Sequence, residues 1–319
     1  MTIVQKAISQ LFGIPTAATI ECGDALNLHI KPNHDYVFRK ELIRDLLVFF
    51  RVGRRSCMLT GHKGSGKTTL IEQLYQRIGI NIYSMTGNGK TTLESLIGQY
   101  VMKEDGSLAW QDSPLVKAAR EGSAILINEF NAMPEDVQLA LNDIAETGAP
   151  ISIPEKGEIF QPAEGFKLYA TINPKGASSY MYKGRKELDS SLRERFFWIV
   201  VPYASREEEK NILLKTWAEC TGEDAESYTA LCDQILNVAE RVRHLNKSTG
   251  EDAISEILST RVLVNWSIYW TAYRKVSGAV HIALQRALTG SCAPEVAYTI
   301  HKLVEIEVGV PSPLTMENV

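Results

Sequence analysis

The sequence predicts an α/β protein in which a five-stranded parallel sheet precedes an all-helical domain. Short apolar runs alternate with helical patterns in the first part of the chain, and this alternation is typical of a parallel sheet covered by helices on both faces. The expected strands are 56–60, 80–85, 124–128, 166–172 and 196–201. We therefore predict three regions, which are an irregular leader over 1–35, an α/β domain over 36–204 and helices over 205–319.

The helical region opens with a helix-start signature. Ser205 is followed three residues later by Glu208, a capping-box pattern in which each side chain bonds the backbone of the other residue. Apolar residues then recur at helical spacing, with no convincing strand among them. The expected helices are 205–218, 224–243, 260–275, 277–288 and 294–307.

Composition excludes several classes of protein. The chain has 319 residues, and none of its apolar runs approaches the roughly 20 residues that a membrane-spanning helix needs. Its start lacks a cleavable signal sequence, so we expect a cytoplasmic protein without membrane contact. The formal net charge of -4 disfavours avid binding of nucleic acid by an isolated chain. The five cysteines and six histidines show no zinc-ligand spacing and no disulfide framework.

The segment GHKGSGKTT, from Gly61 to Thr69, matches the phosphate-loop pattern G-x-x-x-x-G-K-[ST] in full. It follows an apolar strand and precedes a helical pattern, which is the context that this loop requires. Glycines let backbone N–H groups approach phosphates, Lys67 would neutralise the β- and γ-phosphates of ATP, and the Thr68 hydroxyl would ligate Mg²⁺. The predicted nucleotide-binding residues of the loop are Gly61, His62, Lys63, Gly64, Ser65, Gly66, Lys67, Thr68 and Thr69.

A second segment, SMTGNGKTT over 84–92, repeats the Gly-Lys-Thr-Thr ending. Counting back from Lys90 places Ser84 where the first glycine of the pattern should stand. We favour a turn that opens the next helix over a second phosphate loop.

Asn128 and Glu129 close the apolar run 124–128. A phosphate-loop ATPase commonly has an Asp at the first of these positions, which holds Mg²⁺ through water, and a second acid that polarises the attacking water. Asn128 keeps an acceptor oxygen but lacks the charge, which could contribute at most about 4 kcal/mol at roughly 4 Å and a dielectric of about 20. We expect this loss to weaken Mg²⁺ binding rather than water activation by Glu129, and so we predict an active ATPase with a high Mg²⁺ requirement.

Several segments together resemble one protein family. The stretches NEFNAMPEDVQLALNDIAETG and ISIPEKGEIFQPAEGFKLYATINP are similar to the MoxR branch of AAA+ ATPases. LIGQYVMKEDGSLAWQDSPL (96–115) resembles the hairpin that this branch inserts in its second helix, and GRKELDSSLRERF (184–196) resembles its arginine-finger segment. The segment from Tyr36 to the phosphate-loop helix is most similar to the ATPase subunit of cobalt chelatase and to relatives that activate carbon-fixing or nitric-oxide-reducing enzymes. The resemblance extends from Tyr36 to Tyr273 and departs from the family at Asn128.

The resemblance implies roles for four further residues. Asn173 matches the first sensor, which orients the attacking water, although an Asn before Pro174 is also a common turn residue. Arg195, and as second choice Arg193, match arginine fingers that act on a neighbouring subunit, whereas surface ion pairing is the alternative. Arg261 matches the second sensor.

Two hairpins and an aromatic helix complete the prediction. The inserted stretch 103–110 and the segment 151–160, with its turn at Glu155 to Gly157, would act on partners or be plain surface hairpins. The aromatic residues at 266, 269, 270 and 273 are expected to pack in a helical core.

The resemblance implies a homo-oligomeric ring, which we expect to be a hexamer, with ATP and Mg²⁺ at each interface. Such a ring would remodel or activate a client protein, including one with a von Willebrand A-type domain. Two alternatives stay open. The first is an assembly switch that binds ATP but hardly hydrolyses it, and the second is a nucleic-acid motor of a restriction-type system, which the acidic composition disfavours.

Overall fold

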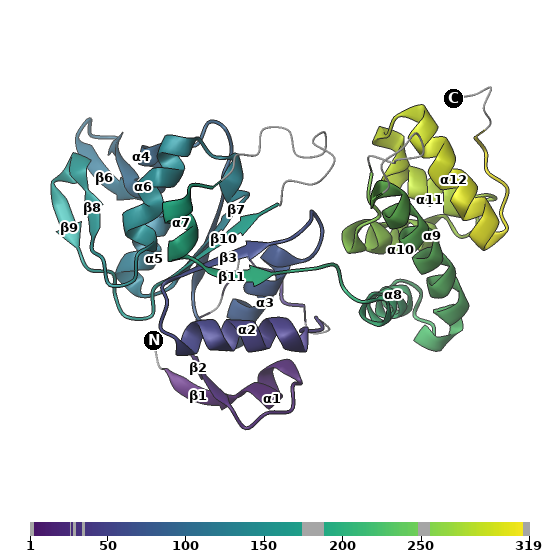
Figure 1. Cartoon of the computed structure of the whole chain (residues 1–319), viewed down its shortest axis with the longest axis horizontal. Helices are drawn as coiled ribbons and strands as arrows, with labels where there is room; N and C mark the ends of the chain where they lie inside the picture. Colours follow the sequence, from purple (N-terminus) through teal and green to yellow (C-terminus); the bar gives the residue numbers. More distant parts are fainter. Residues whose placement is uncertain are drawn as a thin grey trace. The chain divides into compact units, whose positions relative to one another are not determined.

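The computed structural model describes residues 3–25, 27, 30–33, 36–173, 188–247 and 256–314. Two compact units make up the described chain (Figure 1). The first contains the residues up to Gly61, then those from Gly66, and ends at Val201. The second contains His62–Ser65 and the residues from Pro202 onward. The change of unit falls between Val201 and Pro202, whereas the sequence predicted it between 204 and 205.

A five-stranded parallel sheet forms the centre of the first unit (Figure 1). Its strand order is β11-β3-β10-β7-β4. The strands are β3 (Ser56–Thr60), β4 (Ile82–Thr86), β7 (Ala124–Asn128), β10 (Lys167–Ile172) and β11 (Phe197–Val200). The predicted α/β fold is therefore confirmed, and each strand lies where an apolar run predicted one.

Helices cover both faces of this sheet because successive strand residues point to opposite sides. In β7, Ile125 and Ile127 enter one hydrophobic core, while Ala124 and Leu126 enter the other. The first core is completed by α4 (Leu93–Ile97), α5 (Pro114–Glu121), α6 (Glu135–Ala145) and α7 (Ser190–Arg195). The second core is completed by α2 (Lys40–Arg51) and α3 (Lys67–Ile78).

The N-terminal segment corrects the prediction of an irregular leader over 1–35. Its described part forms β1 (Val4–Ala7), α1 (Ile8–Phe12) and β2 (Thr19–Cys22), with the two strands antiparallel. Ile8, Phe12, Ile20 and Cys22 are buried in the core that contains α2 and α3. The elements are too short to give a clear period, and packing against the rest of the unit stabilises them instead.

Both predicted hairpins are present in the first unit. β5 (Gly98–Met102) pairs with β6 (Leu108–Asp112), and β8 (Ile151–Ile153) pairs with β9 (Glu158–Phe160). A short 3-10 helix, η2 (Pro154–Lys156), and Gly157 at φ 63° form the turn of the second hairpin. Another 3-10 helix, η1 (Phe130–Ala132), follows β7.

The second unit is helical in its described part. Its elements are α8 (Arg206–Thr221), η3 (Ala225–Tyr228), α9 (Thr229–Lys247), α10 (Thr260–Tyr273), α11 (Ala279–Ala287), η4 (Thr289–Ser291) and α12 (Pro294–Val308). Ser205 and Glu208 form the predicted capping box at the start of α8. Trp266 of α10 is fully buried, and Tyr269 and Trp270 pack against the same core, as predicted, whereas the half-buried Tyr273 is not part of that core. No helix in the described ranges has the length and apolarity that crossing a bilayer would need.

Candidate functional site

Predicted functional residues meet at one edge of the parallel sheet. β3, β10 and β7 are neighbours, so their carboxyl ends bring Gly61, Asn173 and the pair Asn128–Glu129 to the same edge. The register supports this, because Ile172 lies opposite Thr60 and the Gly61 N–H donates to the Ile172 carbonyl at 3.4 Å. Ligands of open α/β sheets bind at this edge.

The phosphate loop connects β3 to α3 and curls tightly. Gly64 and Gly66 have φ values of 80° and 87°, in the left-handed region that favours glycine. The Ser65 N–H donates to the His62 carbonyl at 3.2 Å within the loop. At the N-cap of α3, Gly66 provides no side-chain acceptor for the first N–H groups of this 12-residue helix. A helix start of this kind fits a bound phosphate.

Lys67 joins the loop to the end of β10. Its side chain is buried, and its ammonium group donates to the Gly61 carbonyl at 2.6 Å and to Asn173 Oδ1 at 3.0 Å. Both of these acceptors are neutral, and the two hydrogen bonds orient the ammonium group. The structure thus brings the predicted phosphate-binding lysine and the predicted first sensor into direct contact. Pro174, on which the turn alternative for Asn173 depends, lies outside the described residues.

Thr68 and Asn128, the predicted Mg²⁺ pair, are also in contact. The Thr68 hydroxyl donates to Asn128 Oδ1 at 2.5 Å, and Thr171 Oγ1 donates to the same oxygen at 3.4 Å. Asn128 Nδ2 donates to Ser84 Oγ at 3.3 Å, which fixes the direction of the amide. Hydroxyl and amide oxygens are hard ligands of the type that Mg²⁺ accepts, so the donor set fits this metal.

Glu129 has an unusual backbone conformation. Its φ of 54° and ψ of 40° lie in the left-handed region, and it is the only non-glycine residue with positive φ in the described ranges. The Glu129 N–H donates to Thr171 Oγ1 at 3.2 Å, which supports this conformation. Strain of this kind is characteristic of functional sites.

Sequence reasoning missed three residues that support this group. Thr171 contacts both Asn128 and Glu129, Ser84 accepts from Asn128, and the buried Asn131 donates to the Asn173 carbonyl at 3.1 Å. Strand alternation gives a signal for Thr171, because it precedes Asn173 by two positions in the strand pattern. Neither Ser84 nor Asn131 carries a comparable signal.

The structure does not place the two candidate arginine fingers in this group. Arg195 of α7 pairs with Glu146 at 3.3 Å and donates to the Ser191 carbonyl at 2.6 Å. Arg193 is exposed and donates to the Leu188 carbonyl at 2.9 Å. The first residues of the predicted finger segment, 184–187, lie outside the described residues. Action of these arginines on a neighbouring subunit therefore stays a prediction.

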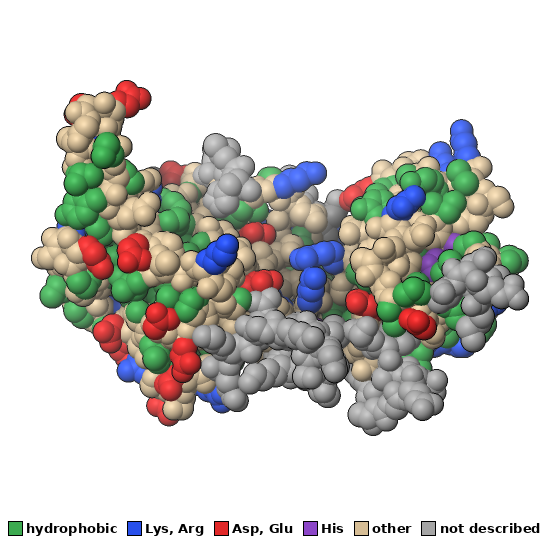
Figure 2. All heavy atoms as spheres, turned by 90° about the horizontal axis from the view of Figure 1, so that it is seen from above, with side chains coloured by type: hydrophobic (Ala, Val, Ile, Leu, Met, Phe, Trp, Pro, Cys, Tyr) green, Lys and Arg blue, Asp and Glu red, His purple; other side chains and the backbone are tan. Residues whose placement is uncertain are grey.

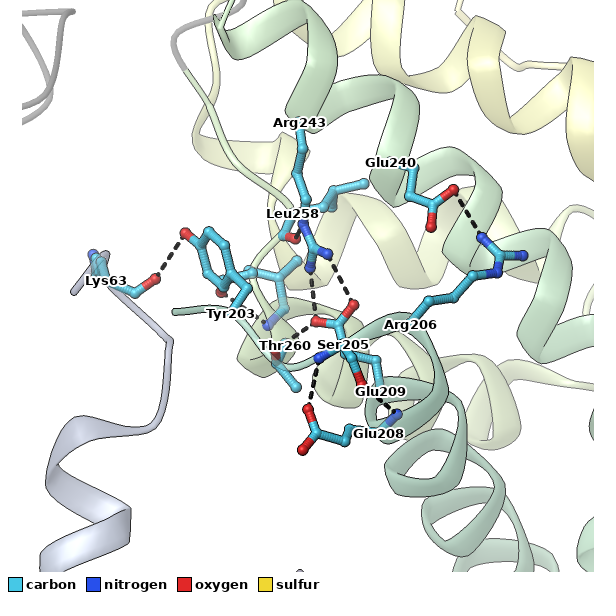
Figure 3. Close-up of polar contacts among 12 residues, drawn as sticks. Lys63, Tyr203, Ser205, Arg206, Glu208, Glu209, Glu240, Arg243, Leu258 and Thr260 are labelled. Atoms are coloured by element: carbon cyan, nitrogen blue, oxygen red, sulfur yellow. Dashed lines mark hydrogen bonds and ion pairs between the residues drawn. The ribbon is translucent and has the colours of Figure 1, made fainter. Parts of the chain in front are cut away.

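Arg261 lies in the second unit, exposed in the first turn of α10. Ser259 caps this helix and lies close to Gly64, where an added Cβ would come within 2.5 Å of Ser259 Oγ. Tyr203 donates through its hydroxyl to the Lys63 carbonyl at 3.3 Å (Figure 3). Within the second unit, phosphate-loop residues 62–65 therefore contact the segment that leads into the Arg261 helix.

Comparison with known proteins identifies two consecutive family regions. Residues 56–196 match the AAA domain of the dynein-related subfamily, and residues 221–306 match the CbbQ/NirQ/NorQ C-terminal domain. Protein CbbQ from Hydrogenophilus thermoluteolus is 30% identical over 65% of this chain and 71% of its own length. The aerobic cobaltochelatase subunit CobS from Sinorhizobium is 24% identical over 82% of this chain and 79% of its length. Midasin from Dictyostelium discoideum is 33% identical over 62% of this chain, which spans only 3% of midasin.

Each of the two matched regions coincides with one part of the structure. The first region contains the sheet edge and its phosphate loop, and the second contains most of the helical unit. The chain therefore belongs to the CbbQ/NirQ/NorQ family of MoxR-type AAA+ ATPases.

Proposed function

We propose that this protein hydrolyses ATP in a ring of identical subunits and uses the cycle to activate a client protein. One observation carries the proposal. The Lys67–Asn173 and Thr68–Asn128 contacts lie together with Glu129 at the edge of the sheet where the phosphate loop begins. A buried cation, hard oxygen ligands and a carboxylate are the groups that phosphoryl transfer to water requires.

Each residue of this edge has a distinct role in the proposed chemistry. The Lys67 ammonium group would neutralise the β- and γ-phosphates, while the N–H groups at the start of α3 would donate to phosphate oxygens. Thr68 Oγ1 would hold Mg²⁺ directly and Asn128 Oδ1 would hold it through water. When bound, Mg²⁺ supplies charge compensation on the phosphates.

The remaining residues act on the water and on the developing charge. The Glu129 carboxylate would orient the attacking water and accept its proton, and the Asn173 amide would help to fix that water. Arg195, or Arg193 as second choice, would come from a neighbouring subunit to stabilise the transition state, which makes ring assembly a requirement for turnover. Arg261 would contact the γ-phosphate from the helical unit.

The two hairpins are the proposed contact surface for the client. Tyr100 pairs across the first hairpin with Trp110, and Met102 pairs with Leu108, so these residues share one face. On this face, the exposed fractions of Tyr100, Met102 and Leu108 are 51%, 75% and 66%. An apolar face of this kind, exposed on a hairpin, suits a protein partner. The cobaltochelatase relative is named as a subunit of a larger enzyme, and a client with a von Willebrand A-type domain is included in the proposal.

Nucleic acid is a less suitable partner. Among the described residues, Figure 2 shows acidic and basic side chains interspersed over the α/β unit on the face that it presents, without a continuous basic stripe. Binding to a nucleic-acid backbone depends on clustered positive charge. Stimulation of turnover by DNA or RNA at low salt would contradict this assignment.

Phosphate release by the wild type and by Glu129→Gln tests the proposal. We expect wild-type turnover to rise with Mg²⁺ concentration and the variant to be slower by roughly 10² to 10⁴-fold, because general-base catalysis is worth about that much. If the wild type and Glu129→Gln release phosphate at equal, near-zero rates at high Mg²⁺, the assembly switch is favoured. The missing charge at Asn128 is the observation that supports this alternative. Particle images of the Glu129→Gln protein with ATP would show whether it forms a hexameric ring, and affinity capture with the same variant would isolate the client.

A further inference from the structure

A buried ion pair joins two helices of the second unit. Glu209 of α8 is 1% exposed, and Arg243 of α9 binds its carboxylate through two hydrogen bonds of 2.8 Å each (Figure 3). A buried pair of this kind costs desolvation free energy, and apolar residues of similar volume can stabilise a core as well or better. The pair therefore suggests a role beyond holding α8 and α9 together.

Two further hydrogen-bond partners of the pair lie at the start of α10. Arg243 Nε donates to the Leu258 carbonyl at 2.9 Å, and Thr260 Oγ1 donates to Glu209 Oε1 at 2.6 Å. Figure 3 shows the Arg243 guanidinium and the Thr260 hydroxyl at the Glu209 carboxylate, and the Leu258 carbonyl at Arg243. The backbone directly before Arg261 is thus fixed from both sides of Ser259.

Arg243 also contacts the residue that reaches the phosphate loop. Its guanidinium carbon lies 4.9 Å from the centre of the Tyr203 ring, which is cation–π distance. The Tyr203 hydroxyl donates to the Lys63 carbonyl, and the Tyr203 ring stacks on His62 with centroids 5.7 Å apart. Lys63 and His62 belong to the second unit together with Tyr203.

We propose that the Glu209–Arg243 pair is a positioning element for nucleotide binding, which holds Tyr203 against residues 62–63 and holds the start of α10 at Arg261. This inference rests on the proposed function, because it assumes that the phosphate loop binds ATP. Neither Glu209 nor Arg243 needs to touch the nucleotide. Their effect passes through Tyr203 on one side and through residues 258–260 on the other.

The sharpest test removes one hydroxyl group. Tyr203→Phe keeps the ring over Arg243 but loses the hydrogen bond to the Lys63 carbonyl, so ATP should bind roughly 2- to 10-fold more weakly. Tyr228→Phe is the matched control, since Tyr228 lies in the same unit and its hydroxyl donates to Glu223 at 2.5 Å. We expect the control to bind a fluorescent ATP analogue as the wild type does. Equal affinities for Tyr203→Phe and the control would overturn the proposal.

A second pair of variants separates positioning from simple stability. Arg243→Lys keeps the charge but loses the bidentate contact with Glu209. Arg241→Lys is the control on the same helix, because Arg241 pairs with Glu307 at 2.6 Å. We expect Arg243→Lys to raise the KM for ATP several-fold, with less effect in an Arg261→Ala background, where part of the pathway is already lost. A lower melting temperature with unchanged KM would mean a structural role only and would overturn the proposal.

Wild-type affinity for the ATP analogue is measured first. No binding by the wild type would overturn the proposed function, and with it this inference. Normal wild-type binding that is insensitive to Tyr203→Phe and Arg243→Lys would overturn this inference alone.

Discussion

Two segments of the chain end in Gly-Lys-Thr-Thr, yet only one has the structure of a phosphate loop. Residues 66–69 follow β3, which lies between β10 and β11, whereas residues 89–92 follow β4 at the edge of the sheet. A loop after an inner strand has the carboxyl ends of neighbouring strands on both sides. A loop after an edge strand has them on one side only.

The lysines differ in their surroundings. Lys67 is 8% exposed and bonds two acceptors on neighbouring strand ends, whereas Lys90 is exposed to solvent. Before Lys67 the glycine has a φ of 87°, while Gly89 is outside the left-handed region. The first loop therefore aims its lysine at one point, and the second leaves its lysine in solvent.

The threonines and the following helices differ in the same way. Thr68 donates to Asn128 on another strand, but Thr91 Oγ1 accepts the Asn88 N–H of its own loop at 2.9 Å. The five-residue α4 is closed by a capping box between Thr92 and Ser95, whereas α3 has no side-chain cap. The full spacing of the motif therefore matters, because it decides which side chains of the loop face a ligand.

Apart from substitution of the lysines themselves, substitution of the glycine before each lysine should give the largest difference in ATP affinity between the two loops. Gly66→Ala places a side chain at positive φ and costs about 1–2 kcal/mol, so we expect ATP affinity to fall roughly 5- to 30-fold. Gly89→Ala meets no atom within 4 Å and should leave the affinity unchanged. Titration with a fluorescent ATP analogue measures both. A larger loss at Gly89 than at Gly66 would break the comparison.

Replacing an asparagine near each loop by aspartate should give the next largest difference, measured as the Mg²⁺ requirement of hydrolysis. Asn128→Asp adds a carboxylate beside the Thr68 hydroxyl, so the Mg²⁺ concentration for half-maximal hydrolysis should fall roughly tenfold, well inside the Coulomb limit. Asn88→Asp makes the same change in the second loop, where Asn88 Oδ1 accepts the Lys90 N–H at 2.8 Å. Phosphate release at varied Mg²⁺ compares the two. Equal shifts would show that the position of the charge is unimportant.

Removal of the cap from α4 should give the smallest effect. Thr92→Ala should lower the free energy of unfolding by about 1 kcal/mol, because the helix loses its N-cap acceptor. ATP hydrolysis should be unchanged, since the second loop has no role in it. Urea unfolding and phosphate release together check this prediction, with Ser95→Ala, which removes the other half of the capping box, as the companion variant. A clear loss of hydrolysis with intact stability would assign function to the second loop.

Local signals predicted most of the sheet and much of the site. All five strands, the phosphate loop and the second hairpin were visible because each depends on short-range periodicity or spacing, whereas the first hairpin was predicted from the family resemblance. Thr68 and Asn128, which are 60 positions apart, could be paired because both had a place in a known pattern.

Features that depend on tertiary contacts could not be predicted from local sequence signals. β1, α1 and β2 are stabilised by burial in the core with α2 and α3, which the local sequence does not show. The left-handed backbone of Glu129 and its support by Thr171 depend on the packing of β7 beside β10. The Glu209–Arg243 pair links residues 34 positions apart without any motif.

Equilibrium binding of ATP to Lys67→Met and Lys90→Met tests the central claim most directly. Methionine keeps an apolar side chain of similar length but removes the charge and the hydrogen-bond donors of the ammonium group, and thermal unfolding checks that both variants fold. We expect Lys67→Met to bind ATP at least roughly tenfold more weakly and Lys90→Met to bind it as the wild type does. Retained binding by a folded Lys67→Met, or its loss in Lys90→Met, would contradict the account.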